Sequence, residues 1–108
     1  GEQMKLMTKE LEKALPPISS TDGQGGDAII HAKFFDPTGS WTWYATEYDP
    51  EEKIFFGLVH GWDEELGYFG LEELESVELQ FGLGIERDKS WKAKPLREVI
   101  QNKAYIGE

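Results

Sequence analysis

Apolar residues, many of them β-branched or aromatic, gather in three stretches that polar turn signals separate. The stretches cover residues 28–35, 41–48 and 54–62, and their composition is typical of β-strands. Both connections, at residues 36–40 and 49–53, begin with Asp-Pro, and proline supplies the fixed φ of a type I turn. Because turns this short join antiparallel strands, the pattern predicts an antiparallel meander.

Helical signals lie on both sides of this meander. Thr8 is suited to cap a helix over residues 8–15, which the prolines at 16 and 17 would end. A short acidic helix is predicted over Leu71–Val77, and Pro95 suits the first position of a C-terminal helix. Weaker candidates for extra strands are Gly67–Gly70, Glu78–Gly84 and Trp91–Lys94. We therefore expect an α+β fold: an antiparallel meander sheet of three to five strands with an N-terminal helix, a short acidic helix and a C-terminal helix.

Length and composition bound the class of protein. The 108 residues are 39% apolar and 13% aromatic, enough for one α+β domain, which we expect over residues 4–108. Gly1–Gln3, ahead of Met4, are expected to be a cloning remnant. No apolar run approaches the roughly 20 residues of a membrane span, so no membrane partner is expected. The absence of cysteine excludes disulfides, thiolate zinc sites and a cysteine nucleophile, and it fits a cytoplasmic protein.

The two turns suggest how the strands pair, and the pairing sorts their side chains by face. If Phe35 opposes Trp41 and Tyr48 opposes Ile54, even and odd positions lie on opposite faces of the sheet. The even positions form the predicted core face, and they include Ala28, Ile30, Ala32, Phe34, Tyr44, Ile54, Phe56 and Leu58. The odd positions mix aromatic and polar side chains, and they include Ile29, His31, Lys33, Phe35, Trp41, Trp43, Glu47, Phe55 and Val59.

The odd face has two interpretations. A helix or the C-terminal segment could cover it, so that both faces of the sheet are core. Alternatively, the odd face is an exposed platform on which bases stack, beside cationic groups that meet a phosphate. The residues of this platform are Phe35, Trp41, Trp43, Phe55, Lys33 and His31. Such a surface is typical of proteins that bind single-stranded RNA or DNA, although the same patch could dock a protein.

Charge is distributed unevenly along the chain. The net charge is −10; residues 47–78 alone carry −10, whereas residues 87–103 carry +4. An acidic chain repels phosphates, which disfavours general electrostatic binding to duplex DNA. The acidic region, with Glu72, Glu73 and Glu75 on the predicted helix, is a surface suited to a basic protein partner. Its carboxylates show no metal-ligand spacing, so we expect no metal and no cofactor.

Signals for catalysis are weak, and an enzymatic role is not favoured. His31 and His60 invite a general acid/base pair, but the pairing above places them on opposite faces. A small metal-independent nuclease would instead combine His31 with Glu47, Glu86 or Arg87. Arg87 could hold a phosphate or carboxylate, or join a salt-bridge network in a turn. The Gly-rich stretch at residues 19–27 lacks Gly-Lys-Ser/Thr, and no serine lies in Gly-x-Ser-x-Gly.

Several ordered motifs carry a family resemblance over about residues 4–100. The motifs are Leu6–Leu11 with Leu15–Pro17, His31–Pro37, Trp41–Glu47, Phe55–Gly57, Glu65–Phe69 and Ile85–Asp88. In this order they resemble a family of small uncharacterised proteins, a domain of unknown function carried on conjugative plasmids, integrative elements and phages. The resemblance implies a bacterial, cytoplasmic, mobile-element setting and brings no established activity. Its polar and aromatic positions of interest are His31, Lys33, Trp41, Trp43, Tyr44, Glu47, Glu86 and Arg87.

Three hypotheses follow from the sequence. The first is a non-enzymatic accessory protein of a mobile element that binds single-stranded nucleic acid, RNA in particular, on the aromatic sheet face. The second is a protein-interaction module that uses the acidic surface at residues 47–78 against a host or element-encoded partner. The third is the small metal-independent nuclease.

Overall fold

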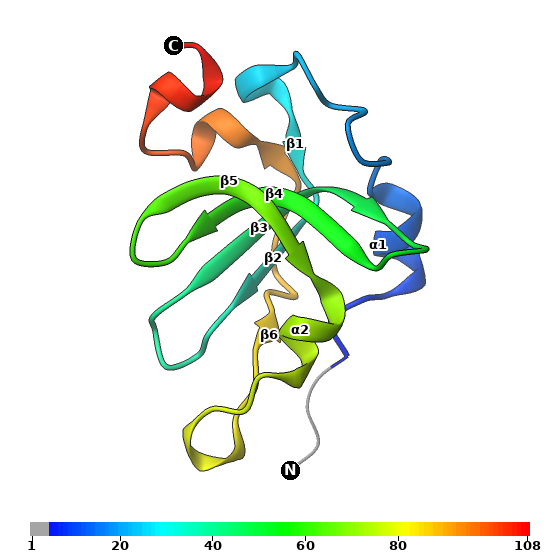
Figure 1. Ribbon diagram of the computed structural model, residues 1–108, viewed down its shortest axis with the longest axis vertical. Helices are drawn as coiled ribbons and strands as arrows, with labels where there is room; N and C mark the ends of the chain where they lie inside the picture. The colour runs from blue at the N-terminus through cyan, green and yellow to red at the C-terminus, as the bar shows by residue number, and fades with distance from the viewer. Residues whose placement is uncertain (1–4) are drawn as a thin grey trace.

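A five-stranded antiparallel sheet is the centre of the structure, a computed structural model that describes residues 5–108 (Figure 1). The strands lie in the spatial order β5-β4-β3-β2-β6. Their bounds are β2 Ala32–Phe35, β3 Thr42–Asp49, β4 Ile54–His60, β5 Glu64–Gly70 and β6 Glu86–Arg87. A second sheet pairs β1, Ile29–Ile30, with β7, Lys94–Pro95. Because β2 to β5 are neighbours in space as in sequence, the predicted α+β fold with an antiparallel meander is confirmed.

Short helices pack around the sheet. They are α1 (Lys9–Ala14), α2 (Leu71–Ser76) and the 3-10 helices η1 (Gly25–Asp27), η2 (Gln80–Gly82), η3 (Leu96–Glu98) and η4 (Lys103–Ile106). The Thr8 hydroxyl accepts a hydrogen bond from the Leu11 amide at 3.1 Å, so the predicted N-cap is confirmed. The acidic helix also forms as predicted, with Leu71 and Leu74 buried. Among the described residues, no helix combines the length and apolar character that crossing a membrane requires.

The predicted C-terminal helix forms only as two short 3-10 helices. After Pro95 the chain makes only the short η3 and η4. The cause is a distant carboxylate, since Glu64 accepts hydrogen bonds from the Gln101 and Asn102 amides, both at 2.7 Å. Those amides are therefore not available to continue a helix from η3.

The weaker segments are also settled by the structure. Gly67–Gly70 is the last part of the longer strand β5, whereas Glu78–Gly84 contains η2 and is not a strand. The expected edge strand begins at Lys94 and not at Trp91. Strand β6 was not predicted, because two residues are too few to show a period.

The strand pairing differs from the expected pairing by one residue. Phe35 lies opposite Thr42, and Tyr48 lies opposite Phe55. A β-bulge at residues 45–47 shifts the register within β3. Because neighbouring residues in a strand alternate faces, each one-residue shift exchanges the faces of the residues beyond it. The even and odd assignment is therefore wrong for β2 relative to β3 and for residues 47 and 48, whereas the expected pairing of residues 42–45 with residues 57–60 is confirmed.

Both faces of the sheet are core. The first core lies under the N-terminal segment and α2, and its buried residues are Leu6, Leu15, Ala32, Phe34, Ala45, Tyr48, Phe55, Phe69, Leu71, Leu74 and Ile85. The second core lies under the C-terminal segment, and its buried residues are Ile30, Tyr44, Leu58, Leu96 and Ile100. The interpretation in which both faces of the sheet are core is thus confirmed, with the N-terminal segment and α2 over the face of Phe55 and the C-terminal segment over the face of Tyr44.

Candidate functional site

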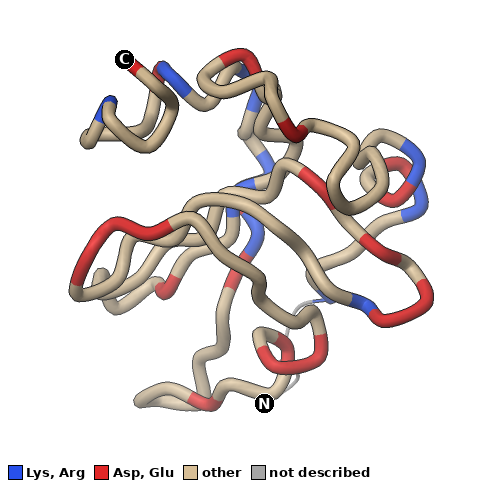
Figure 2. Tube along the Cα trace, turned by 45° about the horizontal axis from the view of Figure 1, so that its top comes forward, with Lys and Arg blue, Asp and Glu red and all other residues tan. Residues whose placement is uncertain are grey.

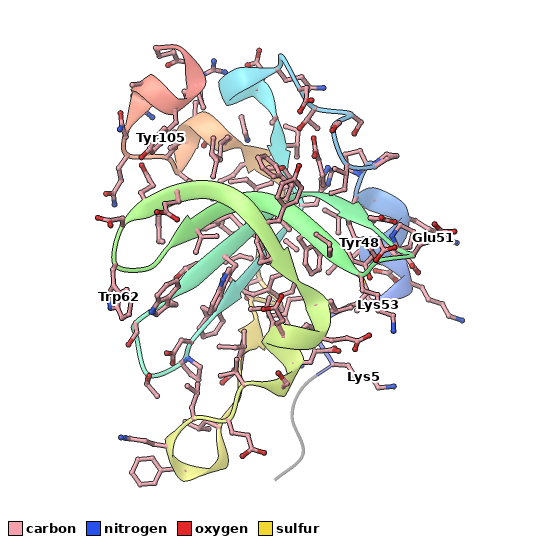
Figure 3. The ribbon with its side chains drawn as sticks, in the orientation of Figure 1. Lys5, Tyr48, Glu51, Lys53, Trp62 and Tyr105 are labelled. Atoms are coloured by element: carbon pink, nitrogen blue, oxygen red, sulfur yellow. The ribbon has the colours of Figure 1, made fainter. Side chains whose placement is uncertain are left out.

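Two tryptophans at the start of β3 stack on each other. The ring centroids of Trp41 and Trp43 lie 6.0 Å apart, with an interplanar angle of 25°. Trp62, in the β4–β5 turn, meets Trp41 edge-on at 5.7 Å and is 92% exposed. Figure 3 shows its side chain projecting away from the sheet. The three indoles form a continuous aromatic surface at one end of the sheet.

The surrounding backbone holds Trp41 in place. The Asp36 amide donates to the Trp41 carbonyl at 2.9 Å, and the Asp36 carboxylate accepts hydrogen bonds from the Thr38 amide and hydroxyl. Gly61 makes room for the indole, because a Cβ at this position would lie 2.3 Å from the Trp41 ring. An indole positioned in advance loses less entropy when it binds a partner.

An apolar groove, which we call the tryptophan groove, runs beside the indoles. It has a volume of about 440 Å³ and lies between the β2–β3 turn and the segment after α2. Its lining residues are Asp36, Ser40, Trp41, Trp43, Val77, Leu79 and Ile85. Since most of these side chains are apolar, covering the groove would remove apolar surface from water and stabilise a complex.

The loop beyond the groove presents further apolar surface. Phe81 is 94% exposed and Leu83 is 39% exposed. Phe81 has φ of 63°, in the left-handed region that costs free energy for a bulky residue. The Leu79 amide donates to the Leu83 carbonyl at 2.7 Å and closes the loop. The Phe81 ring is therefore available to a partner.

The predicted stacking platform does not form as one surface. Phe55 lies on the same face as Trp43 but is buried in the first core, where its ring stacks on Phe69 at 5.2 Å, because the N-terminal segment and α2 cover this part of the face. The strand pairing places Phe35 and Lys33 on the face opposite Trp43. The structure thus brings Trp41 and Trp43 together, places Phe35 and Lys33 on the other face and buries Phe55 in the core.

The cationic candidates gather at the other edge of the sheet, around β6. The Lys33 ammonium lies 3.9 Å from the Asp88 carboxylate. The Arg87 guanidinium donates to two carbonyl oxygens of the N-terminal segment, at 3.1 and 3.3 Å. A hollow of about 450 Å³ here is lined by Lys33, Phe35, Glu86, Arg87, Asp88 and Lys89. Because carboxylates alternate with its cations, the hollow has no strong preference for an anion.

The two histidines are far apart and have different surroundings. His31 lines a hollow beside α1, and burial lowers its pKa. His60 Nε2 lies 2.6 Å from the Glu64 carboxylate. His60 in β4 and Phe35 in β2 both lie opposite Thr42 in β3. Strand spacings therefore give a separation of roughly 16 Å between His31 and His60. A separation of this size does not suit a general acid/base pair at one scissile bond.

Glu47 is an internal anchor, so its prediction as part of the odd face and the acidic surface is wrong. It is 1% exposed and accepts hydrogen bonds from the Ser19 amide at 2.8 Å and the Thr21 amide at 2.9 Å. The Thr21 hydroxyl donates to the same carboxylate. The bulge in β3 turns this side chain inward, where it ties the Gly-rich loop to the sheet. Both carboxylate oxygens are thus bonded to the loop, and the buried side chain does not suit catalysis with His31.

Glu64 is a second anchor. Burial acts to raise its pKa, but the hydrogen bonds from the Gln101 and Asn102 amides and from His60 outweigh burial and lower it. The carboxylate is therefore ionised at neutral pH and holds the C-terminal segment over the second core.

The acidic residues of α2 do lie on the surface. Glu72 and Glu73 are exposed, and Glu75 is half-buried and accepts a backbone hydrogen bond at 3.1 Å. Lys53, the one basic residue at positions 47–78 of the sequence, lies 3.2 Å from Glu72. Figure 2 shows red segments on α2 and on the β3–β4 and β4–β5 turns. Within residues 5–108, no cluster of His, Asp and Glu is suited to hold a metal ion.

The second wall of the groove was missed in the sequence. Val77, Leu79 and Ile85 lie within or beside a segment of ambiguous structure. The alternation of Val77 and Leu79 with the polar residues Ser76, Glu78 and Gln80 is the signal that could have indicated one apolar side to this segment.

Comparison with known proteins gives a family. No curated protein and no solved structure matches this chain. A family model described as a protein of unknown function (DUF2958) matches residues 6–105, which is nearly the whole chain. The chain therefore belongs to the DUF2958 family.

Proposed function

We propose that this chain is a non-enzymatic binding protein that holds a protein partner in the tryptophan groove. The observation that carries the proposal is the stacked pair of Trp41 and Trp43 facing an apolar wall at residues 77–85. Tryptophan is enriched among the residues that dominate interface energy, because it covers a large apolar area. The partner inserts apolar side chains between the indoles and this wall.

Charge supports a basic partner. The net charge is −10, and residues 54–86 contain no Lys or Arg. Basic residues flanking the apolar anchors would speed the encounter, and salt would weaken this effect. Reversing the charges of Glu72, Glu73 and Glu75 should therefore weaken binding more at low salt than at high salt. The bacterial, cytoplasmic, mobile-element setting is part of the proposal and rests on the sequence resemblance alone.

Peptide selection against the folded protein tests the proposal. A random peptide library should yield ligands that join aromatic or branched apolar residues to Lys or Arg and that change the tryptophan fluorescence. Leu79→Asp in the groove wall should lower the affinity for the best ligand about 30-fold, which corresponds to a loss of about 2 kcal/mol of binding free energy at an interface hot spot.

Two further variants control for folding and for position. Phe81→Asp changes an exposed ring and should also weaken binding, without a loss of stability. Tyr105→Ala, on η4 and outside the groove (Figure 3), should bind as the wild type does. Ligands that bind Leu79→Asp and Phe81→Asp as tightly as the wild type would contradict the proposal.

Single-stranded nucleic acid is the second candidate partner. The stacked geometry of Trp41 and Trp43 favours it, because a base can continue such a stack. Lys33 and His31 do not flank this surface, so it lacks the expected phosphate contacts. Fluorescence anisotropy with labelled single-stranded RNA, single-stranded DNA and duplex DNA, at low and moderate salt, separates the candidates. If the wild type binds a single strand saturably and Trp41→Ala does not, the partner of this surface is a nucleic acid and not a protein.

The nuclease is the weakest candidate. Of its predicted residues, His31 and Arg87 line the same hollow beside α1, whereas Glu47 is buried. Cleavage of RNA or DNA that His31→Ala abolishes would support this activity. Purified protein that cleaves neither substrate, with and without divalent metal, would exclude it.

A further inference from the structure

Strand β5 forms an open edge of the sheet. All seven of its residues, Glu64–Gly70, pair with β4 in an unbroken register. In the part of the chain that the structure describes, no backbone hydrogen bond joins β5 to a segment on its other side. An edge of this kind presents a row of N–H and C=O groups that another strand can pair with.

The opposite edge of the sheet is protected. Strand β6 has only two residues, Glu86 and Arg87, and both are charged. The Arg87 side chain also binds backbone carbonyls of the N-terminal segment, which covers this side. Strand β5 contains no Lys and no Pro, and no bulge interrupts its pairing. A very short strand and a covering segment thus protect β6 and are missing at β5, where the charged residues are confined to Glu64 and Glu65 at its start.

Side chains along β5 offer contacts to an added strand. Tyr68 is 64% exposed, and its ring meets Phe56 edge-on at 5.1 Å. Leu66 points to the same face as Tyr68, since residues two apart in a strand share a face. Gly67, between them, has open space on the opposite face. Apolar side chains of an added strand would pack against Leu66 and Tyr68.

Carboxylates lie at both ends of this edge. At its start, a hollow of about 370 Å³ is lined by Asp63, Glu64, Glu65, Gln101, Asn102 and Tyr105. At its end, β5 runs directly into α2, which carries Glu72 and Glu73 in its first turn. A second copy of this chain, paired antiparallel, would bring these two acidic ends together. The charge therefore favours a basic occupant over a second copy.

We propose that β5 binds an extended, basic segment of a partner protein, which joins the sheet as an additional strand. Main-chain hydrogen bonds to β5 supply affinity, and a Lys or Arg side chain in the acidic hollow supplies specificity. This surface is separate from the tryptophan groove, so Trp41→Ala should leave binding at β5 unchanged.

An NMR titration of the full ¹⁵N-labelled chain tests this proposal. The probe is a seven-residue peptide of alternating lysine and valine. We expect saturable shifts concentrated at Glu64–Gly70 and slower hydrogen exchange of amides in β5. The control peptide has the same composition but carries D-valine, so it keeps the charge and cannot form a regular strand. It should bind at least tenfold more weakly.

Matched variants separate strand pairing from general attraction. Glu65→Lys places a lysine on the edge and should weaken the binding of the lysine–valine peptide at least tenfold. Glu12→Lys makes the same change of charge on α1 and should change binding less than threefold. Equal binding of the two peptides, equal effects of the two variants, shifts outside β5, or no saturable shift would each overturn the proposal. Dimers of the peptide-free protein with protected β5 amides would also overturn it, because the occupant would be a second copy.

Discussion

Replacing Glu47 by alanine tests whether a buried carboxylate holds the Gly-rich loop on the sheet. The substitution removes the acceptor of three hydrogen bonds, from the Ser19 amide, the Thr21 amide and the Thr21 hydroxyl. A hydrogen bond to a charged group contributes about 1.5–3 kcal/mol. Three bonds at the low end of this range contribute about 4.5 kcal/mol, and because water can reach part of the freed loop, we expect a smaller loss of about 3–4 kcal/mol.

That loss is large for a chain of this size. A stability of about 0.05–0.15 kcal/mol per residue gives roughly 5–16 kcal/mol for 108 residues. Glu47→Ala should therefore lose about a fifth or more of the total free energy of unfolding. The corresponding fall in Tm is about 12 °C or more, at about 4 °C per kcal/mol.

Urea unfolding followed by circular dichroism measures this loss, and hydrogen exchange locates it. The Ser19 and Thr21 amides should lose protection in Glu47→Ala before the rest of the sheet does. Thr21→Val, which removes only the hydroxyl, should lower the free energy of unfolding by about 1 kcal/mol. Glu52 is an exposed carboxylate on the β3–β4 turn, so the free energy of unfolding of Glu52→Ala should stay within about 0.5 kcal/mol of the wild-type value. A Glu47→Ala variant within about 1 kcal/mol of the wild type, with the Ser19 amide still protected, would refute the reasoning.

Three further predictions concern space and pH. Gly57→Ala should lower the free energy of unfolding in urea by about 3 kcal/mol or more, because its Cβ would lie 1.8 Å from a backbone oxygen of β3. Gly67→Ala is the control, because a Cβ at Gly67 has open space. Equal stabilities of the two variants would contradict this account. Gly61→Ala should displace the Trp41 ring and shift the tryptophan emission with little change in stability, and an unchanged spectrum would count against the groove geometry. Glu64 has a folded pKa below the ordinary value of about 4.3, so its stabilising contribution is complete above that pH and is lost as the pH falls through the folded pKa. The two C-terminal amides that it binds should then lose hydrogen-exchange protection in acid, and protection that persists to pH 2 would exclude this role.

Much of the fold could be predicted because its signals are local. The Thr8 cap, the two Asp-Pro turns and the acidic helix each depend on a few neighbouring residues, and all of them form as expected. The C-terminal helix was predicted on the same grounds and forms only as the short η3 and η4. Its amides bond to Glu64, which lies 37 and 38 residues away in sequence, and no local pattern records that competition.

By itself, the sequence determined the strands, the turns between them and the concentration of aromatic residues in the sheet. Only the tertiary structure decided which of these residues face water. A one-residue shift at Phe35 placed Lys33 and Phe35 on the face opposite Trp43, and a bulge at residues 45–47 turned Glu47 inward. The first core buries Phe55, whereas the indoles of Trp41 and Trp43 lie beside an open groove. The physical reason is that register depends on the packing of two cores at once, and that free energy is a sum over contacts between residues distant in the chain.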